Sequence, residues 1–111
     1  GFTGSDAVEP GKVGPALQSR LIKYGTLIKY TLNRQARVQI GIYSSIGTVV
    51  LRRTIDTGNL GGREGLNFFF WNGANEKGRR VSSGAYILIM KVQADDGTTD
   101  TEKRKIGVIG K

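Results

Sequence analysis

Apolar and polar residues alternate with a period of two along most of this chain, beginning at Tyr24. Successive side chains of a β-strand point to opposite faces of its sheet, so such alternation gives a strand one apolar face. The apolar positions of the first two alternating segments are Ile28, Tyr30, Leu32, Val38, Ile40 and Ile42. The pattern therefore predicts strands that pack one face into a core.

Four further strand-like segments follow, each separated from the next by turn residues. The segments are 48–57, 66–71, 86–92 and 99–108. Short strands at a spacing of about ten residues are typical of antiparallel sandwiches and barrels. A sandwich is favoured because alternating sets can fill its two inner faces. We therefore predict an all-β fold, an antiparallel β-sandwich of about seven strands.

The first part of the chain has a different composition. Residues 1–22 show little alternation, and they contain both prolines, Pro10 and Pro15, together with Gly4, Gly11 and Gly14. This composition predicts an extended leader or linker over 1–22 and a single sandwich domain over 23–111. A chain of 111 residues has the usual length for one domain.

The run Phe68-Phe69-Phe70-Trp71 is the most apolar stretch of the sequence. An uninterrupted aromatic run predicts a strand that is covered on both faces or that lies at a corner of the sandwich. We expect all nine aromatic residues (four Phe, four Tyr and one Trp) to belong to the core.

The segment from Trp71 to Tyr86 carries a specific resemblance. It reads Trp71-Asn72-Gly73, then Gly78, then Ser82-Ser83-Gly84-Ala85-Tyr86. This order resembles the Trp-Asp-Gly, Gly, Gly and Tyr pattern of the Ig-like domain first named from the flagellar hook-capping protein. The upstream segments 28–32, 38–43 and 46–50 resemble the same family, so the resemblance covers about residues 24–111. Asn72 departs from the family's usual Asp.

The resemblance implies an Ig-like sandwich from an exported bacterial protein. Segments 83–88 and 102–108 are also similar to the C-terminal sorting domains of proteins carried by a Bacteroidetes-type secretion system. From the residues themselves, we interpret one set as structural: Trp71, Asn72, Gly73, Gly78, Gly84 and Tyr86. Its glycines suit sharp turns, and its Asn side chain can bond the loop backbone. The rival interpretation, carbohydrate stacking on Trp71, requires an exposed indole ring.

Residue types that carry catalysis are scarce. The chain contains no His and no Cys, which removes the common general base and the thiolate metal ligand. The glycine-rich 61–65 lacks the Lys-Ser/Thr pair of a phosphate loop, and 95–100 lacks the spacing of a twelve-residue calcium loop. We therefore predict no enzyme, no cofactor and no metal site.

The net charge of +8 points to an anionic partner or to a solvated surface. Candidate polyanion contacts are Arg79, Arg80, Lys103, Arg104 and Lys105. Neighbouring strand residues point to opposite faces, and the aromatics do not form a stacking platform, so the pattern disfavours nucleic acid. No apolar run reaches the ~20 residues of a membrane helix.

The scarcity of catalytic residue types predicts a non-catalytic structural module, and the family resemblance implies that it belongs to an exported bacterial protein, extracellular or at the cell surface. Its role would be secretion sorting, surface anchoring or self-assembly. Its partners would be other protein chains, or copies of itself, joined by strand addition at sheet edges, with the leader as one candidate strand. The alternative is an accessory module of an extracellular enzyme that binds a carbohydrate or a polyanion, such as an anionic polysaccharide.

Overall fold

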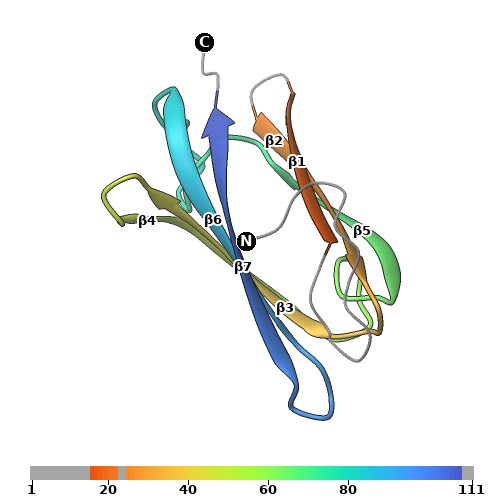
Figure 1. The fold of residues 1–111 in the computed structure, drawn as a ribbon. Coiled ribbons are helices and arrows are strands. Elements are labelled where there is room, and N and C mark those ends of the chain that lie inside the picture. Colours follow the sequence, from red (N-terminus) through yellow and green to blue (C-terminus); the bar gives the residue numbers. More distant parts are fainter. Residues whose placement is uncertain (1–15, 23–24, 109–111) are drawn as a thin grey trace.

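The computed structural model describes residues 16–22 and 25–108, and these form seven strands in two antiparallel sheets (Figure 1). The strands are β1 (Ala16–Ile22), β2 (Gly25–Leu32), β3 (Arg37–Ser44), β4 (Val49–Ile55), β5 (Gly65–Trp71), β6 (Gly84–Gln93) and β7 (Thr99–Val108). The predicted all-β sandwich is confirmed.

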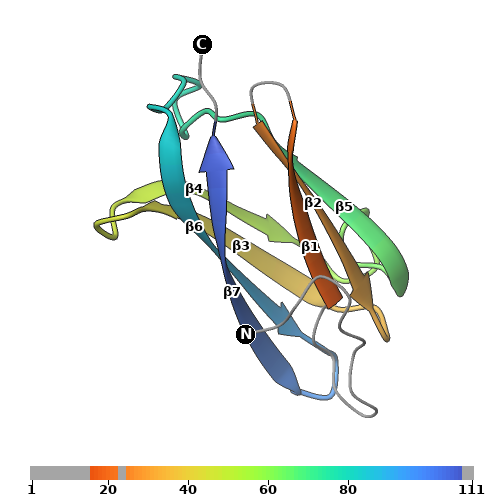
Figure 2. The ribbon, with the colours of Figure 1, turned by 45° about the horizontal axis from the view of Figure 1, so that its top comes forward.

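One sheet has three strands in the order β1-β2-β5, and the other has four in the order β4-β3-β6-β7. Figure 2 shows the two sheets as separate layers, with β5 at the side of the small sheet that lies away from β1. After β2 the chain crosses to the large sheet and forms β3 and β4. It then returns to the small sheet, where β5 pairs with β2.

The core lies between the sheets and is built from alternate residues. Thr26, Ile28, Tyr30 and Leu32 of β2 are all buried. The predicted inward sets of β3 and β6 are buried as well: Val38, Ile40, Ile42, Tyr86, Leu88, Met90 and Val92. The alternation of the sequence therefore assigns the inner face of these strands correctly.

Two side-chain hydrogen bonds tie distant parts of the sandwich together. The Thr26 hydroxyl donates to the Gly107 carbonyl at 2.7 Å and so joins β2 to β7. The buried Tyr30 hydroxyl donates to the Gly61 carbonyl at 2.7 Å, in the β4–β5 connection. Burial raises the pKa of Tyr30 to about 12, because the phenolate cannot be solvated there.

Strand β1 falls within the range 1–22 that the sequence assigned to the leader. It pairs with β2 along its whole length, from Ala16 opposite Thr31 to Ile22 opposite Gly25. The sandwich thus begins before residue 23. The sequence of β1 gives a weak signal because Leu21 and Ile22 are adjacent and interrupt its alternation. The rest of the proposed leader, residues 1–15, lies outside the described residues.

The expectation for the aromatic run is wrong. Trp71 is buried and Phe69 packs against the core, but Phe68 and Phe70 are exposed on the opposite face of β5. Alternation sends every second residue outward, and no described strand lies over the outer face of the three-stranded sheet. The aromatic residues are therefore divided between the core and the surface.

Candidate functional site

The outer face of β5 carries a stripe of large apolar side chains, which we call the β5 stripe. It consists of Leu66, Phe68 and Phe70, with exposed fractions of 57%, 53% and 48%. In the register of the small sheet, these residues lie beside Thr31, Lys29 and Leu27 of β2. Three large apolar residues that share one exposed strand face mark a surface suited to protein contact.

The same strand is an edge of its sheet. It pairs with β2 on one side, and no described strand pairs with it on the other. In an antiparallel pair, alternate residues turn their backbone N–H and C=O groups away from the partner, so β5 presents unpaired groups to a further strand. No residue from Gly65 to Trp71 is charged. This edge therefore lacks the charges that commonly prevent strand addition.

Strand β4, an edge of the large sheet, is covered by Glu76. The backbone N–H of Glu76 donates to the Val50 carbonyl at 3.2 Å, and its Oε2 accepts from the Arg52 N–H at 2.8 Å. Its Oε1 pairs with Arg53 Nη1 at 3.0 Å. The Arg52 N–H above all, and then Arg53, hold the pKa of the Glu76 carboxyl below its usual value of 4.5. Two backbone groups on this edge of β4, the Val50 carbonyl and the Arg52 N–H, are therefore already hydrogen-bonded.

Strand β7, the other edge of the large sheet, has charged residues on its inner side. Asp100, Glu102 and Arg104 lie opposite Val92, Met90 and Leu88, whose side chains are buried, so they share that side of the sheet. Charged residues that point inward on an edge strand oppose pairing with another chain, because pairing would desolvate them. Of these three edges, β5 is the one best suited to strand addition.

A hollow of about 320 Å³ lies between the edges of β4 and β5. Its lining includes Leu51 and Arg53 of β4, Phe69 and Trp71 of β5, and Glu76 of the following loop. A strand added beside β5 would therefore lie next to an opening at the side of the sandwich. Its inward side chains would meet both polar and apolar groups there.

The corner that follows β5 is closed by its own contacts. The Trp71 side chain is 1% exposed, and its indole Nε1 donates to the Ala74 carbonyl at 2.8 Å. The Tyr86 ring meets the Trp71 ring edge to face, with centroids 5.4 Å apart. The Tyr86 hydroxyl donates to the Ser82 carbonyl at 2.6 Å. Because Trp71 is buried, its ring offers no face on which a sugar could stack.

The hydrogen bond made by Asn72 shows why this loop can have Asn where the family usually has Asp. Its Oδ1 accepts the Ala74 N–H at 3.0 Å, a bond that a carboxylate could also accept, so the turn needs an acceptor and not a negative charge. Gly73 and Gly78 have φ angles of 79° and 80°, in the region that favours glycine. Gly84 starts β6. The six residues of the predicted structural set thus lie in or beside one corner.

The predicted basic residues do not form one patch. Arg79 and Arg80 lie exposed in the loop between β5 and β6. Lys103 and Lys105 project from the outer face of β7, whereas Arg104 points to the opposite side. Sequence reasoning missed Lys91, which shares the outer face of the large sheet with Arg52. Only strand register shows this grouping.

Residues for metal or membrane chemistry are not gathered in the described parts of the chain. Within 16–22 and 25–108, no three His, Cys, Asp or Glu side chains are placed to hold a metal ion together. None of these residues belongs to a helix with the length and apolar character needed to cross a membrane.

Comparison with solved structures places this fold among known sandwiches. FlgD of P. aeruginosa superposes with a TM-score of 0.57 at 22% identity, over 73% of this chain and 60% of that chain. FlgD of Xanthomonas campestris, whose structure is described as giving insights into the hook capping essential for flagellar assembly, gives 0.60 at 15% identity, over 82% and 63%. CopC of Methylosinus trichosporium OB3b gives 0.54 at 18%, over 78% and 79%.

This chain therefore spans less than two thirds of the length of either FlgD structure. A search of proteins with curated descriptions found no significant match. Residues 23–97 match the sequence profile of the FlgD Ig-like domain, which includes β2 to β6 and the corner from Trp71 to Tyr86. This chain belongs to the FlgD Ig-like domain family.

Proposed function

We propose that this domain is a non-catalytic assembly module of an exported bacterial protein, and that two copies associate through β5. The observation that carries the proposal is the uncharged, open edge of β5 together with the exposed β5 stripe. Membership of the FlgD Ig-like family supports an assembly role, because one FlgD structure is described in terms of hook capping in flagellar assembly. Such a role places the domain outside the bacterial cytoplasm.

Strand β5 is self-complementary in antiparallel pairing. A two-fold axis at Phe68 sets Gly65 opposite Trp71 of the second copy, and Leu66 opposite Phe70. Phe68 then lies opposite its own counterpart. All three residues of the β5 stripe meet apolar side chains, and the two small sheets become one continuous sheet of six strands. No charged residue enters the paired segment.

Two terms favour this pairing, and they must exceed the loss of translational and rotational freedom on association and the repulsion between the two chains. Each aromatic or aliphatic cross-strand pair contributes roughly 0.2–1 kcal/mol, and buried apolar surface adds about 25 cal/mol per Å². The net charge of +8 on each chain opposes association. Salt screens that repulsion, so dimerisation through β5 should strengthen as ionic strength rises.

Secretion sorting and surface anchoring are compatible with the same edge if its partner is a strand of another protein. The carbohydrate-binding alternative has less support, because Trp71 is buried in the corner and bonded to Ala74.

Sedimentation equilibrium on three chains tests the proposal. The wild-type chain should be a dimer at high concentration, and Phe68→Lys should be a monomer. The matched control Thr101→Lys adds the same charge on an exposed residue of β7 and should remain a dimer. A wild-type monomer throughout, or equal loss of dimer in both variants, would contradict the proposal.

Removal of residues 1–15 separates β5 pairing from leader pairing. A dimer that persists without these residues supports β5, because both β5 strands are still present. A dimer that is lost on truncation would assign the pairing to the leader and overturn the role of β5.

A further inference from the structure

We propose that the outer face of the four-stranded sheet is a second docking surface, which binds an acidic surface of a different protein. We call it the basic face and define it by the outward cationic residues Arg52, Lys91, Lys103 and Lys105. They come from three strands that the sheet brings together. Each is exposed.

The basic face has one sign of charge. Strands β3, β4 and β6 contain no Asp or Glu, and the two acidic residues of β7, Asp100 and Glu102, lie on its inner side. Within the described part of the chain, none of the four side chains that define the face forms an ion pair. The charges of Lys91, Lys103 and Lys105 are therefore available to an acidic partner, whereas the charge of Arg52 also interacts with the Glu76 carboxylate.

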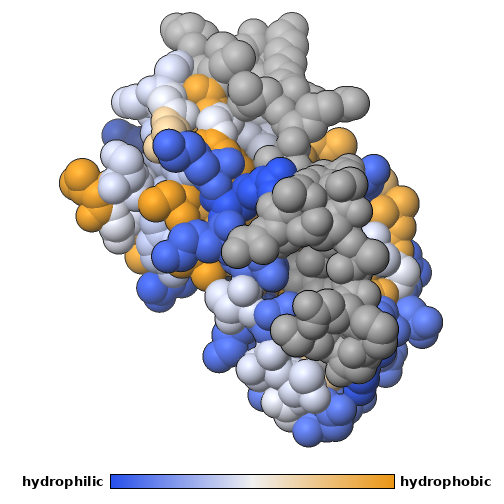
Figure 3. Space-filling model, in the orientation of Figure 1, coloured by the Kyte–Doolittle hydropathy of each residue, from blue (hydrophilic) through white to orange (hydrophobic). Residues whose placement is uncertain are grey.

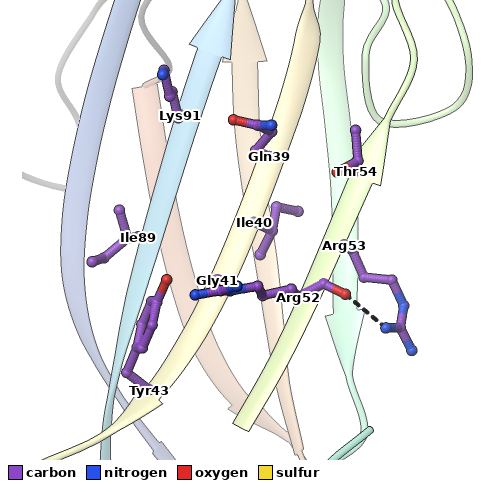
Figure 4. A pocket seen from close by; sticks show the side chains of 9 residues that line it. All are labelled: Gln39, Ile40, Gly41, Tyr43, Arg52, Arg53, Thr54, Ile89 and Lys91. Atoms are coloured by element: carbon purple, nitrogen blue, oxygen red, sulfur yellow. Dashed lines mark hydrogen bonds between the residues drawn. The ribbon is translucent and has the colours of Figure 1, made fainter. Parts of the chain in front are cut away.

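A hollow of about 340 Å³ lies in this face above Gly41 (Figure 4). Arg52 extends from β4 across Gly41 toward Tyr43, and Lys91 lies on β6 beside Gln39 of β3. A Cβ at Gly41 would lie 2.8 Å from the Tyr43 ring, so glycine at this position lets that ring lie close over the strand. Donors from Gln39 and Thr54 also line it, and no carboxylate does. The hollow suits a partner's carboxylate.

Half-buried apolar residues lie between the cations. Ile87 is opposite Lys105 in the register of β6 and β7, and Ile89 is opposite Lys103. Figure 3 shows hydrophobic residues among strongly hydrophilic ones over these strands. An apolar centre with a polar rim is the usual composition of a protein–protein interface. A polysaccharide or nucleic acid would leave the two isoleucines unused, and Tyr43 alone makes no stacking platform.

The occupant of the basic face is not a second copy of this chain. Two chains of net charge +8 repel one another, and they do so most strongly where their cations converge. A partner with an acidic rim and an apolar centre matches the face in both charge and hydrophobicity. The proposal is independent of β5, which lies in the other sheet.

Fluorescence anisotropy with three labelled probes tests the basic face. The first probe is a peptide of mixed Glu and Leu, the second replaces each Glu by Gln, and the third is heparin. We expect binding of the acidic peptide that weakens with salt, and binding at least about tenfold weaker for the Gln peptide. The Phe68→Lys background removes β5 pairing from the measurement.

Two charge-matched variants locate the binding. Lys103→Glu with Lys105→Glu should weaken binding of the acidic peptide by about tenfold or more. Lys77→Glu with Arg79→Glu makes the same change in net charge on exposed loop residues and should leave the affinity within about twofold. Lys103→Gln with Lys105→Gln repeats the test with a milder change, and circular dichroism checks that each variant is folded.

Ile87→Ser with Ile89→Ser tests the apolar centre. This variant should weaken binding of the Glu–Leu peptide but leave binding of a polyglutamate control unchanged. If Lys103→Glu with Lys105→Glu and Lys77→Glu with Arg79→Glu weakened peptide binding equally, the attraction would be diffuse and electrostatic. That result would overturn the proposal. Tight heparin binding without binding of the acidic peptide would overturn it as well, in favour of a polysaccharide surface, and no binding of any probe would also do so.

Discussion

The two faces of β5 have similar composition but contribute differently. Asn67, Phe69 and Trp71 point into the sandwich, where Asn67 and Trp71 are buried and hydrogen-bonded. The β5 stripe points outward and meets no described strand. Inner and outer residues alternate along the strand. We therefore assign fold stability to the inner positions and association to the outer positions of this single strand. Substitutions on one face should change unfolding, and substitutions on the other should change assembly.

The largest expected effect is on the inner face. Trp71→Ala removes the largest buried side chain and leaves a cavity beside Tyr86, so it should lower the free energy of unfolding by about 3–5 kcal/mol. Trp71→Phe should cost less, because it keeps an aromatic ring but loses the bond to Ala74. Urea unfolding measures both. A loss below about 1 kcal/mol for Trp71→Ala would contradict the assignment of this face to stability.

Asn67 provides the polar counterpart on the same face. Its Nδ2 donates to the Arg63 carbonyl at 2.7 Å and to the Gly65 carbonyl at 3.1 Å, which fixes the turn that leads into β5. Asn67→Ala should lower the free energy of unfolding by about 1–3 kcal/mol, because it removes two part-buried hydrogen bonds and leaves the Arg63 and Gly65 carbonyls without this partner. Thr31→Ala, an exposed position on the neighbouring strand, is the control and should change it by less than about 0.5 kcal/mol. Similar losses for the two variants would contradict the role of Asn67.

On the outer face, we expect little change in monomer stability. Phe68→Thr keeps a β-forming residue at an exposed position, so monomer unfolding should shift by no more than about 0.5 kcal/mol. The measurement is urea unfolding at low protein concentration, where any dimer is dissociated. A loss comparable to that of Trp71→Ala would show that the β5 stripe belongs to the fold and remove the contrast between the faces.

The smallest expected effect concerns the covered edge of β4. The pKa of Glu76 is lowered in the folded state, so its stabilising contribution is present above its usual value of 4.5 and is lost as pH falls through the lowered folded value. Glu76→Gln should therefore lower the melting temperature slightly at pH 7, and the difference should disappear in acid. A difference that persists or grows as the pH falls would contradict this assignment.

The sequence predicted the inner faces well because period-two alternation depends on burial alone. The positions of strands within the sheets were not predictable in the same way. The run from Phe68 to Trp71 suggested a strand covered on both faces, but no described strand lies over the outer face of its sheet. Strand β5 is also an edge, because among the described strands it pairs with β2 alone, far away in sequence. Alternation does not say which strand is central.

The remaining differences also come from long-range structure. The bond between Glu76 and the edge of β4 depends on the path of a loop, which no local pattern specifies. Arg52 and Lys103 reach the same face only through the order of strands in the large sheet. The corner at Trp71 was easier to predict from the sequence, because its glycines and Asn72 act locally on the backbone.

The most direct test of the account is disulfide formation at single introduced cysteines, since the native chain contains none. In the proposed register, Phe68→Cys places two thiols opposite one another across the two-fold axis, so mild oxidation should produce a covalent dimer rapidly. Leu66→Cys alone should react slowly, but a mixture with Phe70→Cys should give the heterodimer. Cross-linking at all three positions at equal rates, or at none, would contradict pairing through β5.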